Sequence, residues 1–243
     1  MKCGREVLKS NWKNLEVDLP DRKKGIKNPP YIKPYPQDTE LINLPDIKGF
    51  KPINNDFISL LFNRQSRRRY KDKPISLEEL SYMLFYTQGV KKVVKDKVTF
   101  RTVPSAGATH PLETYIVVFN VKGLEKGIYR YISTEHKLLP IKFENLREEI
   151  IEATLGQRFI GESAVVFVWS AIPYRTEWKY KNEAHKTISI DAGHVCQNLY
   201  LLAESINCGT CAVAAYDQDL MDKLIEVDGK DEFVVYLAPI GKI

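Results

Sequence analysis

The sequence has few cysteines, no long apolar run and no large excess of one charge. Its four cysteines, in 243 residues, are too few and too unevenly spaced for a disulfide framework, which indicates a reducing compartment. The longest nearly unbroken apolar run, residues 164–172, has about half the length that a membrane-spanning helix requires. The charged first residues are not followed by an apolar signal region. We therefore expect a cytoplasmic protein without membrane attachment.

The charge balance is mild and gives no indication of a nucleic-acid partner. The chain carries 36 Lys and Arg residues against 31 Asp and Glu residues, and the net charge of +5 is spread along its length. Such a small excess does not by itself imply nucleic-acid binding. With 44% apolar and 28% charged residues, and without repeats or low-complexity segments, the composition is that of a globular protein.

Proline is concentrated near the N-terminus, where six of the thirteen prolines lie between residues 20 and 45. This density excludes a long helix or a central strand there. We interpret residues 1–53 as an extended arm that packs against another surface, and residues 54–243 as one α+β domain. Periodicity and capping patterns predict helices at 56–63, 76–89, 146–155, 188–206 and 218–225, and strands at 114–119, 127–131, 138–141, 164–169, 210–214 and 232–238.

A basic run, Arg64-Gln65-Ser66-Arg67-Arg68, follows the first expected helix. Guanidinium groups bind phosphate oxygens bidentately and a serine hydroxyl adds a donor, so Arg64, Ser66 and Arg68 could converge on one phosphate. Runs of like charge are more often solvated surface. The position of Ser66 between two arginines at a helix end favours the anion site.

A turn of small residues, Pro104-Ser105-Ala106-Gly107, leads towards the apolar strand at 114–119. Without bulky side chains, the main chain of such a turn can approach a flat ligand closely. The alternative is an ordinary turn, since these are all turn residues. No nucleophile elbow surrounds Ser105, and His110 is either a general acid or a packing residue.

Two further pairs could carry chemistry. Lys179 and Tyr180 follow a segment, residues 174–178, that we expect to be a loop; in a cleft this pair could relay protons, and on the surface it would have no such role. Cys208 and Cys211 have dithiol spacing, but the other cysteines and the histidines lack metal-ligand spacing to them. We therefore expect no metal site.

The basic run, the small-residue turn and the helical segment at 191–199 together resemble the nitroreductase-like flavoproteins, in their SagB-type or thiazole/oxazole-oxidase-like branch. The resemblance implies an α+β sandwich with a central, mostly antiparallel sheet flanked by helices. It also implies an intertwined homodimer with two FMN molecules at the subunit interface, so that neither chain holds a complete site.

The resemblance assigns residue roles as well. It places the phosphate and ribityl end of FMN against the basic run, where Gln65 replaces the second arginine of many members, and the ring against the turn of the opposite subunit. The implied cofactor-binding residues are Arg64, Gln65, Ser66, Arg68, Pro104, Ser105, Ala106, Gly107, Ala214, Ala215 and Lys242, and the implied catalytic residues are Lys179 and Tyr180.

These observations predict an FMN-dependent oxidoreductase in which one substrate reduces the flavin and leaves before a second takes the electrons. The expected partners are a second copy of the chain, a small-molecule or peptide substrate and a nicotinamide donor. Alternatives are an azoline dehydrogenase acting on a modified peptide, and a flavin-binding module without turnover of its own. A nucleic-acid binder ranks last, because the neighbourhood of the basic run offers one tyrosine, Tyr70, and no aromatic stacking platform.

Overall fold

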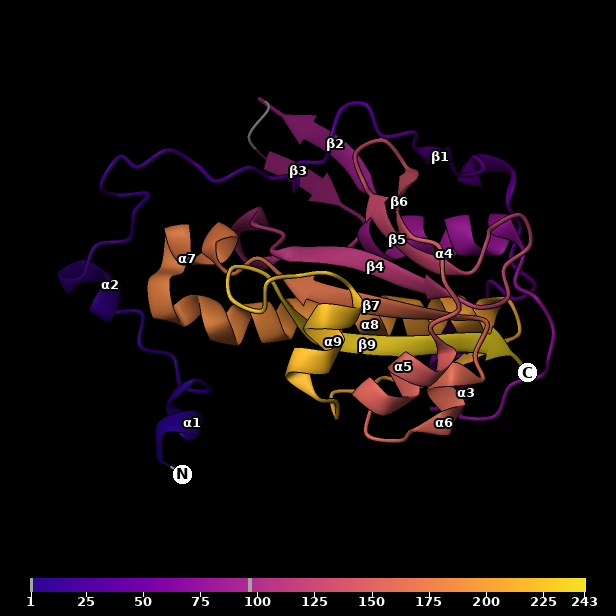
Figure 1. Cartoon of the computed structure of the whole chain (residues 1–243). Helices are drawn as coiled ribbons and strands as arrows, with labels where there is room; N and C mark the ends of the chain where they lie inside the picture. The colour runs from indigo at the N-terminus through magenta and orange to yellow at the C-terminus, as the bar shows by residue number, and fades with distance from the viewer. Residues whose placement is uncertain (1, 96–97) are drawn as a thin grey trace.

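A seven-stranded sheet forms the centre of the molecule in the computed structural model, which describes residues 2–95 and 98–243 (Figure 1). Its strand order is β1-β6-β5-β4-β7-β9-β8, and every neighbouring pair is antiparallel. The predicted α+β fold with a mostly antiparallel sheet is therefore confirmed. The sheet strands are β1 (Ile42–Asn43), β4 (Leu112–Val118), β5 (Gly127–Ile132), β6 (Lys137–Lys142), β7 (Val165–Ala171), β8 (Cys208–Thr210) and β9 (Phe233–Lys242).

Helices cover both faces of this sheet (Figure 1). α4 (Leu77–Gln88) and α8 (Ala184–Ser205) lie on one face, whereas α5 (Arg147–Ala153), α6 (Arg158–Gly161) and α9 (Gln218–Leu224) lie on the other. α8 is long enough to run along most of one face. It contacts both candidate half-sites described below, which are the turn at residues 104–111 and the basic run at residues 64–68. Within the described residues, no helix is long and apolar enough to cross a membrane.

The central strands are buried along their whole length because both faces are covered. In β7, Phe167 and Trp169 pack into the core on the α4–α8 side, and Val166 and Val168 pack into the core on the opposite side. This alternation follows from the two-residue period of a strand. The predicted capping box of α4 is present: the Glu79 N–H donates to Ser76 Oγ at 3.2 Å, and the Ser76 N–H donates to a Glu79 carboxylate oxygen at 3.0 Å.

Several sequence predictions were wrong in detail. The predicted loop at 174–178 is part of α7 (Tyr174–Tyr180), which begins directly after Pro173. Helix α8 begins at Ala184, four residues before the predicted start, and the strand predicted at 210–214 is β8, at Cys208–Thr210. A separate hairpin of β2 (Val90–Val94) and β3 (Val98–Arg101) was not predicted, because lysines interrupt the apolar pattern of β2.

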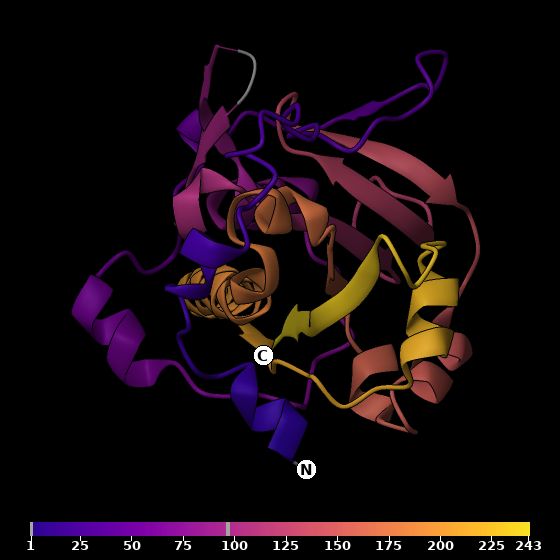
Figure 2. The ribbon, with the colours of Figure 1, turned by 90° about the vertical axis from the view of Figure 1, so that its left-hand side faces the viewer.

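The proline-rich segment crosses the body of the domain (Figures 1 and 2). Two short helices of the arm, α1 (Lys2–Glu6) and α2 (Asn14–Val17), precede it. Figure 2 shows that α1 projects from the body, whereas the chain after α2 lies along α7. Just beyond residue 53, α3 (Phe57–Asn63) packs on α8 and leads into the basic run. The boundary between arm and domain at residue 53 stays a prediction.

Candidate functional site

The turn at residues 104–111 has an unusual backbone. Gly107, Ala108 and His110 have left-handed φ values of 57°, 53° and 45°. This conformation is strained for alanine and histidine, and such strain is found preferentially at functional sites. Gly107 is required for a further reason, because a Cβ at this position would lie 2.2 Å from the hydroxyl oxygen of Tyr180.

Asp191 of α8 holds this turn in place. Ser105 Oγ donates to Asp191 Oδ2 at 2.6 Å, and the Ala106 N–H donates to Asp191 Oδ1 at 3.2 Å. Burial raises the pKa of Asp191, and the hydrogen bond from Ser105 opposes this rise. A contact between the Ala106 amide and a flavin ring would therefore require this hydrogen bond to be shared or exchanged.

Lys179 and Tyr180, at the end of α7, lie against the same turn. Lys179 Nζ donates to the Gly107 carbonyl oxygen at 2.6 Å, and the Tyr180 ring packs edge-on against Trp12 of the arm at a centroid distance of 5.1 Å. Burial, assisted by the nearby positive charge of Arg22, lowers the pKa of Lys179. The structure thus brings the predicted catalytic pair to the predicted ring-binding turn.

Pro104 and His110, near the two ends of the turn, differ in their exposure to solvent. Pro104 is exposed, whereas His110 is buried, and its pKa is lowered to about 3 by burial and by Arg101 and Arg175. A histidine with such a pKa stays neutral at neutral pH and is a poor general acid. Of the two interpretations of His110, the packing residue fits the structure.

The basic run lies at the other end of α8, near Tyr200. The Arg64 guanidinium lies over the Tyr200 ring at 5.3 Å from the ring centroid, and Ser66 Oγ is 2.9 Å from the Tyr200 hydroxyl oxygen. The run is fixed to β8 because the Arg67 N–H donates to the Thr210 carbonyl oxygen at 2.8 Å. An open hollow of about 520 Å³ adjoins the run, lined in part by Gln65, Ser66 and Arg68.

The remaining predicted cofactor residues are placed less favourably. Arg68 points to the ring of Phe159 on α6, at 5.8 Å, and so does not share a partner with Arg64. The Lys242 ammonium is paired with Glu79 and is not free to bind a phosphate unless this pair opens. Ala214 and Ala215 are exposed and follow closely after Ala212, whose N–H donates to the Tyr200 hydroxyl oxygen at 2.8 Å.

The geometry of α8 keeps the turn and the basic run apart within one chain. Asp191 and Tyr200 are nine residues apart on α8, which corresponds to about 14 Å along the axis and to opposite sides of the helix, at roughly 100° per residue. Both residues were missed as site residues by sequence reasoning. Asp191 had a usable signal, because it is an acid within the buried apolar stripe formed by Ile188, Ala192 and Val195.

Both residues of the cysteine pair are buried, and Cys208 is unsuited to reactive chemistry. Cys208 and Cys211 are buried as free thiols, and burial raises the pKa of Cys208 to about 12. A thiol with such a pKa is a poor nucleophile and a poor metal ligand. Among the described residues, no three His, Cys, Asp or Glu side chains gather in a way that could hold a metal ion.

Comparison with known proteins identifies the family. Residues 61–242 match the model of the Nitroreductase family. The chain belongs to this family. Among its nitroreductase relatives, the Methanocaldococcus jannaschii protein named "Putative nitroreductase MJ1384" is 37% identical over 205 residues, which cover 84% of this chain and 98% of that protein. A trifolitoxin-processing protein, TfxB of Rhizobium leguminosarum bv. trifolii, is 22% identical over 63% of this chain and 44% of its own length.

Solved nitroreductase structures share the fold. A Ralstonia eutropha JMP134 protein, also named a putative nitroreductase, has a TM-score of 0.69 at 22% identity and covers 87% of this chain and 93% of its own. The Escherichia coli microcin synthetase McbBCD complex, with truncated pro-MccB17 bound, has a TM-score of 0.63 at 18% identity. The match covers 95% of this chain and 91% of that chain. An FMN-dependent nitroreductase of Clostridium difficile R20291 has a TM-score of 0.51 at 16% identity, and the match covers 76% of this chain and 87% of that chain.

These findings confirm the predicted family. The chain is therefore an oxidoreductase of the nitroreductase superfamily, in a family that generally binds flavin.

Proposed function

We propose that the protein is an FMN-dependent oxidoreductase that works by alternating half-reactions, with each FMN held between two copies of the chain. The observation that carries this proposal is the placement of the two half-sites on opposite sides of α8. A twofold-related second chain would bring the turn of one copy to the basic run of the other.

The residues present fit such a cofactor. Arg64 and Arg68 have aromatic neighbours but no carboxylate partner in the part of the chain that the structure describes, so their charge is available to a phosphate or a flavin ring. Ser66 adds a hydroxyl donor beside Arg64. On the other half, Asp191 fixes Ser105 and Ala106 in the conformation in which they would lie against the ring.

When bound, FMN would supply the hydride or electron transfer, which no side chain of the protein can provide. The protein would bind and orient it. Lys179 Nζ, held at the Gly107 carbonyl oxygen and with a lowered pKa, would hold or release a proton beside the ring. We propose a nicotinamide as the electron donor, since this is the reductant expected for a flavin enzyme of this family.

A second candidate function is azoline dehydrogenation on a modified peptide, which the position of Lys179 and Tyr180 against the turn favours. It predicts that Lys179→Ala or Tyr180→Phe abolishes turnover of such a peptide while bound flavin remains. Full activity of both variants with the peptide would leave the simpler oxidoreductase as the function.

The proposal is tested by the absorption spectrum of the purified protein, because bound oxidised flavin is yellow. Arg64→Ala should weaken FMN retention by about 10- to 100-fold, the range for loss of a charge-assisted hydrogen bond. Arg158→Ala, which removes an exposed arginine on α6, serves as the matched control and should retain FMN. A colourless protein that also takes up no added FMN would refute the proposal.

A further inference from the structure

A second hollow, of about 970 Å³, lies between the proline-rich arm and the end of α7. We call it the arm pocket. The arm contributes one wall, and the body contributes Ala108 and Thr109 of the turn with Trp178 and Lys179 of α7. The residues lining it from the arm are Arg22, Ile26, Lys27, Asn28, Pro29, Pro30, Tyr31 and Ile32.

The arm wall is fixed to α7 by backbone contacts. The Arg22 N–H donates to the Trp178 carbonyl oxygen at 2.9 Å, and Trp178 Nε1–H donates back to the Ile26 carbonyl oxygen at 2.9 Å. Arg175 Nε donates to the Pro30 carbonyl oxygen at 3.1 Å. The adjacent prolines, Pro29 and Pro30, restrict the backbone between these contacts, so the wall is stiff.

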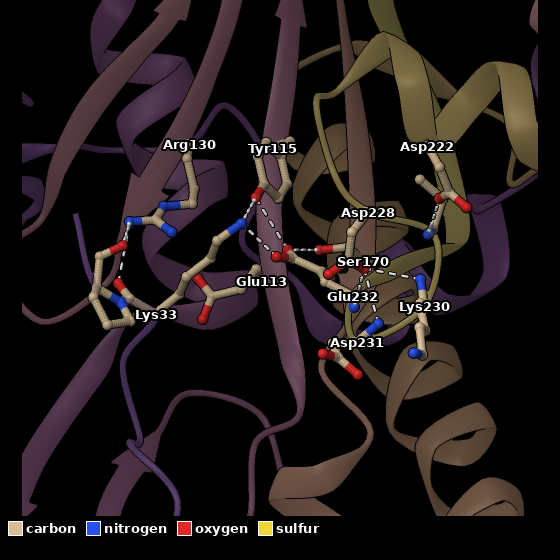
Figure 3. A network of polar contacts seen from close by, with 12 residues as sticks. Lys33, Glu113, Tyr115, Arg130, Ser170, Asp222, Asp228, Lys230, Asp231 and Glu232 are labelled. Atoms are coloured by element: carbon tan, nitrogen blue, oxygen red, sulfur yellow. Dashed lines mark hydrogen bonds and ion pairs between the residues drawn. The ribbon is translucent and has the colours of Figure 1, made fainter. Parts of the chain in front are cut away.

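Beyond the pocket, the arm is anchored in the sheet, as Figure 3 shows. The Lys33 ammonium contacts the Glu232 carboxylate and donates to the Tyr115 hydroxyl oxygen at 2.7 Å. Glu232 is buried and also accepts from Ser170 Oγ at 2.6 Å. Arg130, also buried, donates to the carbonyl oxygens of Lys33 and Pro34, both at 3.1 Å.

The charge of the arm pocket has one sign. Arg22, Lys27 and Lys179 line it, whereas no Asp or Glu among the residues that the structure describes does. The fourth basic residue, Arg175, is already paired with Glu113 at 2.7 Å. An anion would compensate the three remaining positive charges.

The rest of the lining suits an apolar ligand body. Ile26, Pro29, Ile32 and Trp178 present aliphatic and aromatic surface, and the volume is within the range of about 300–1,000 Å³ for sites of drug-sized ligands. Ala108 and Thr109 of the turn line the pocket, and Lys179, which also lines it, donates to the Gly107 carbonyl oxygen of the same turn. A ligand in the arm pocket would therefore lie beside the proposed ring-binding turn.

We propose that the arm pocket is the substrate site and that it takes a small organic carboxylate with an aromatic body, bound by Arg22 and Lys27. The role of this carboxylate as a substrate rests on the proposed function. Its binding to the arm pocket does not, because binding requires no redox activity.

The test is calorimetric titration of the FMN-saturated protein with 4-nitrobenzoate and with its neutral isostere 4-nitrobenzamide. The carboxylate should bind at least about tenfold more tightly than the amide. The double variant Arg22→Gln/Lys27→Gln should lose this preference and leave amide binding unchanged. Lys23→Gln removes an exposed neighbouring charge outside the pocket and should bind as the wild type does.

Equal affinity for acid and amide, or an unchanged preference in the double variant, would overturn the proposal. So would binding of 4-nitrobenzoate to the FMN-free protein but not to the FMN-saturated protein, because the pocket would then belong to the cofactor. If the protein takes up no FMN, the same titration without FMN still decides the arm pocket, so the failure of one proposal is distinguishable from that of the other.

Discussion

At the scale of single residues, Gly107 joins the turn to the predicted catalytic pair. Gly107→Ala should destabilise the protein more than Gly123→Ala does: both glycines have positive φ, at 57° and 82°, but only the new methyl at Gly107 would meet Tyr180. We expect a difference of about 2 kcal/mol in the free energy of unfolding by urea, typical of overpacking. Adding Tyr180→Phe removes the hydroxyl oxygen that would lie 2.2 Å from the new methyl group, and it should recover part of the lost unfolding free energy. Equal costs at both glycines would contradict this contact.

His110 gives the turn a pH dependence. Its pKa in the folded protein is about 3, below the unfolded value of about 6.5, so the unfolded state binds one more proton between these values. Stability is therefore complete above pH 6.5 and falls as the pH is lowered, by up to about 1.4 kcal/mol per pH unit. His136, whose pKa burial also lowers, contributes with the same sign. In urea titrations at pH 5 and 6, His110→Asn should reduce this slope; an unchanged slope would exclude His110 as its source.

At the scale of elements, the anchor of the arm makes its own prediction. Glu232→Gln leaves the Lys33 ammonium without its carboxylate and should cost about 2 kcal/mol of unfolding free energy, with faster proteolysis within residues 2–32. Adding Lys33→Met should recover part of the loss, which a double-mutant cycle measures. Glu144→Gln breaks the more exposed pair with Lys142, outside the arm, and is the control, with an expected cost below about 1 kcal/mol. Similar costs for the two variants would show that the arm is not anchored at Glu232.

Elements were predictable from the sequence where local signals and burial agree. The capping box at Ser76 and the apolar run of β7 gave their elements directly. α7 was missed because its helical pattern is carried by Arg175 and Thr176, polar residues that are buried only through tertiary contacts. For the same reason the turn and the Lys179–Tyr180 pair could be found separately, whereas their meeting through Gly107 and Asp191 could not.

At the scale of the whole molecule, α3 indicates where a second chain would pack. Phe57, Ile58 and Phe62 are 61%, 71% and 89% exposed on this helix, directly before Arg64. Apolar side chains gathered in this way are typical of an interface. We therefore expect light scattering to give about twice the 28.0 kDa of one chain. Ile58→Glu/Phe62→Glu should give monomers that lose FMN, whereas Leu155→Glu, at a distant exposed position, should not. A wild-type monomer that retains FMN would refute the shared site.

The ion pair between Lys33 and Glu232 spans 199 residues of sequence. During synthesis on the ribosome, Lys33 emerges long before Glu232 and lacks this partner until the 199 residues after it have been made. Contacts of such long range form late in folding, because the entropy cost of ordering the intervening chain comes before the favourable energy of the contact. A nascent chain that ends before residue 232 would therefore hold the arm wall only through its contacts with α7, without the anchor at Glu232.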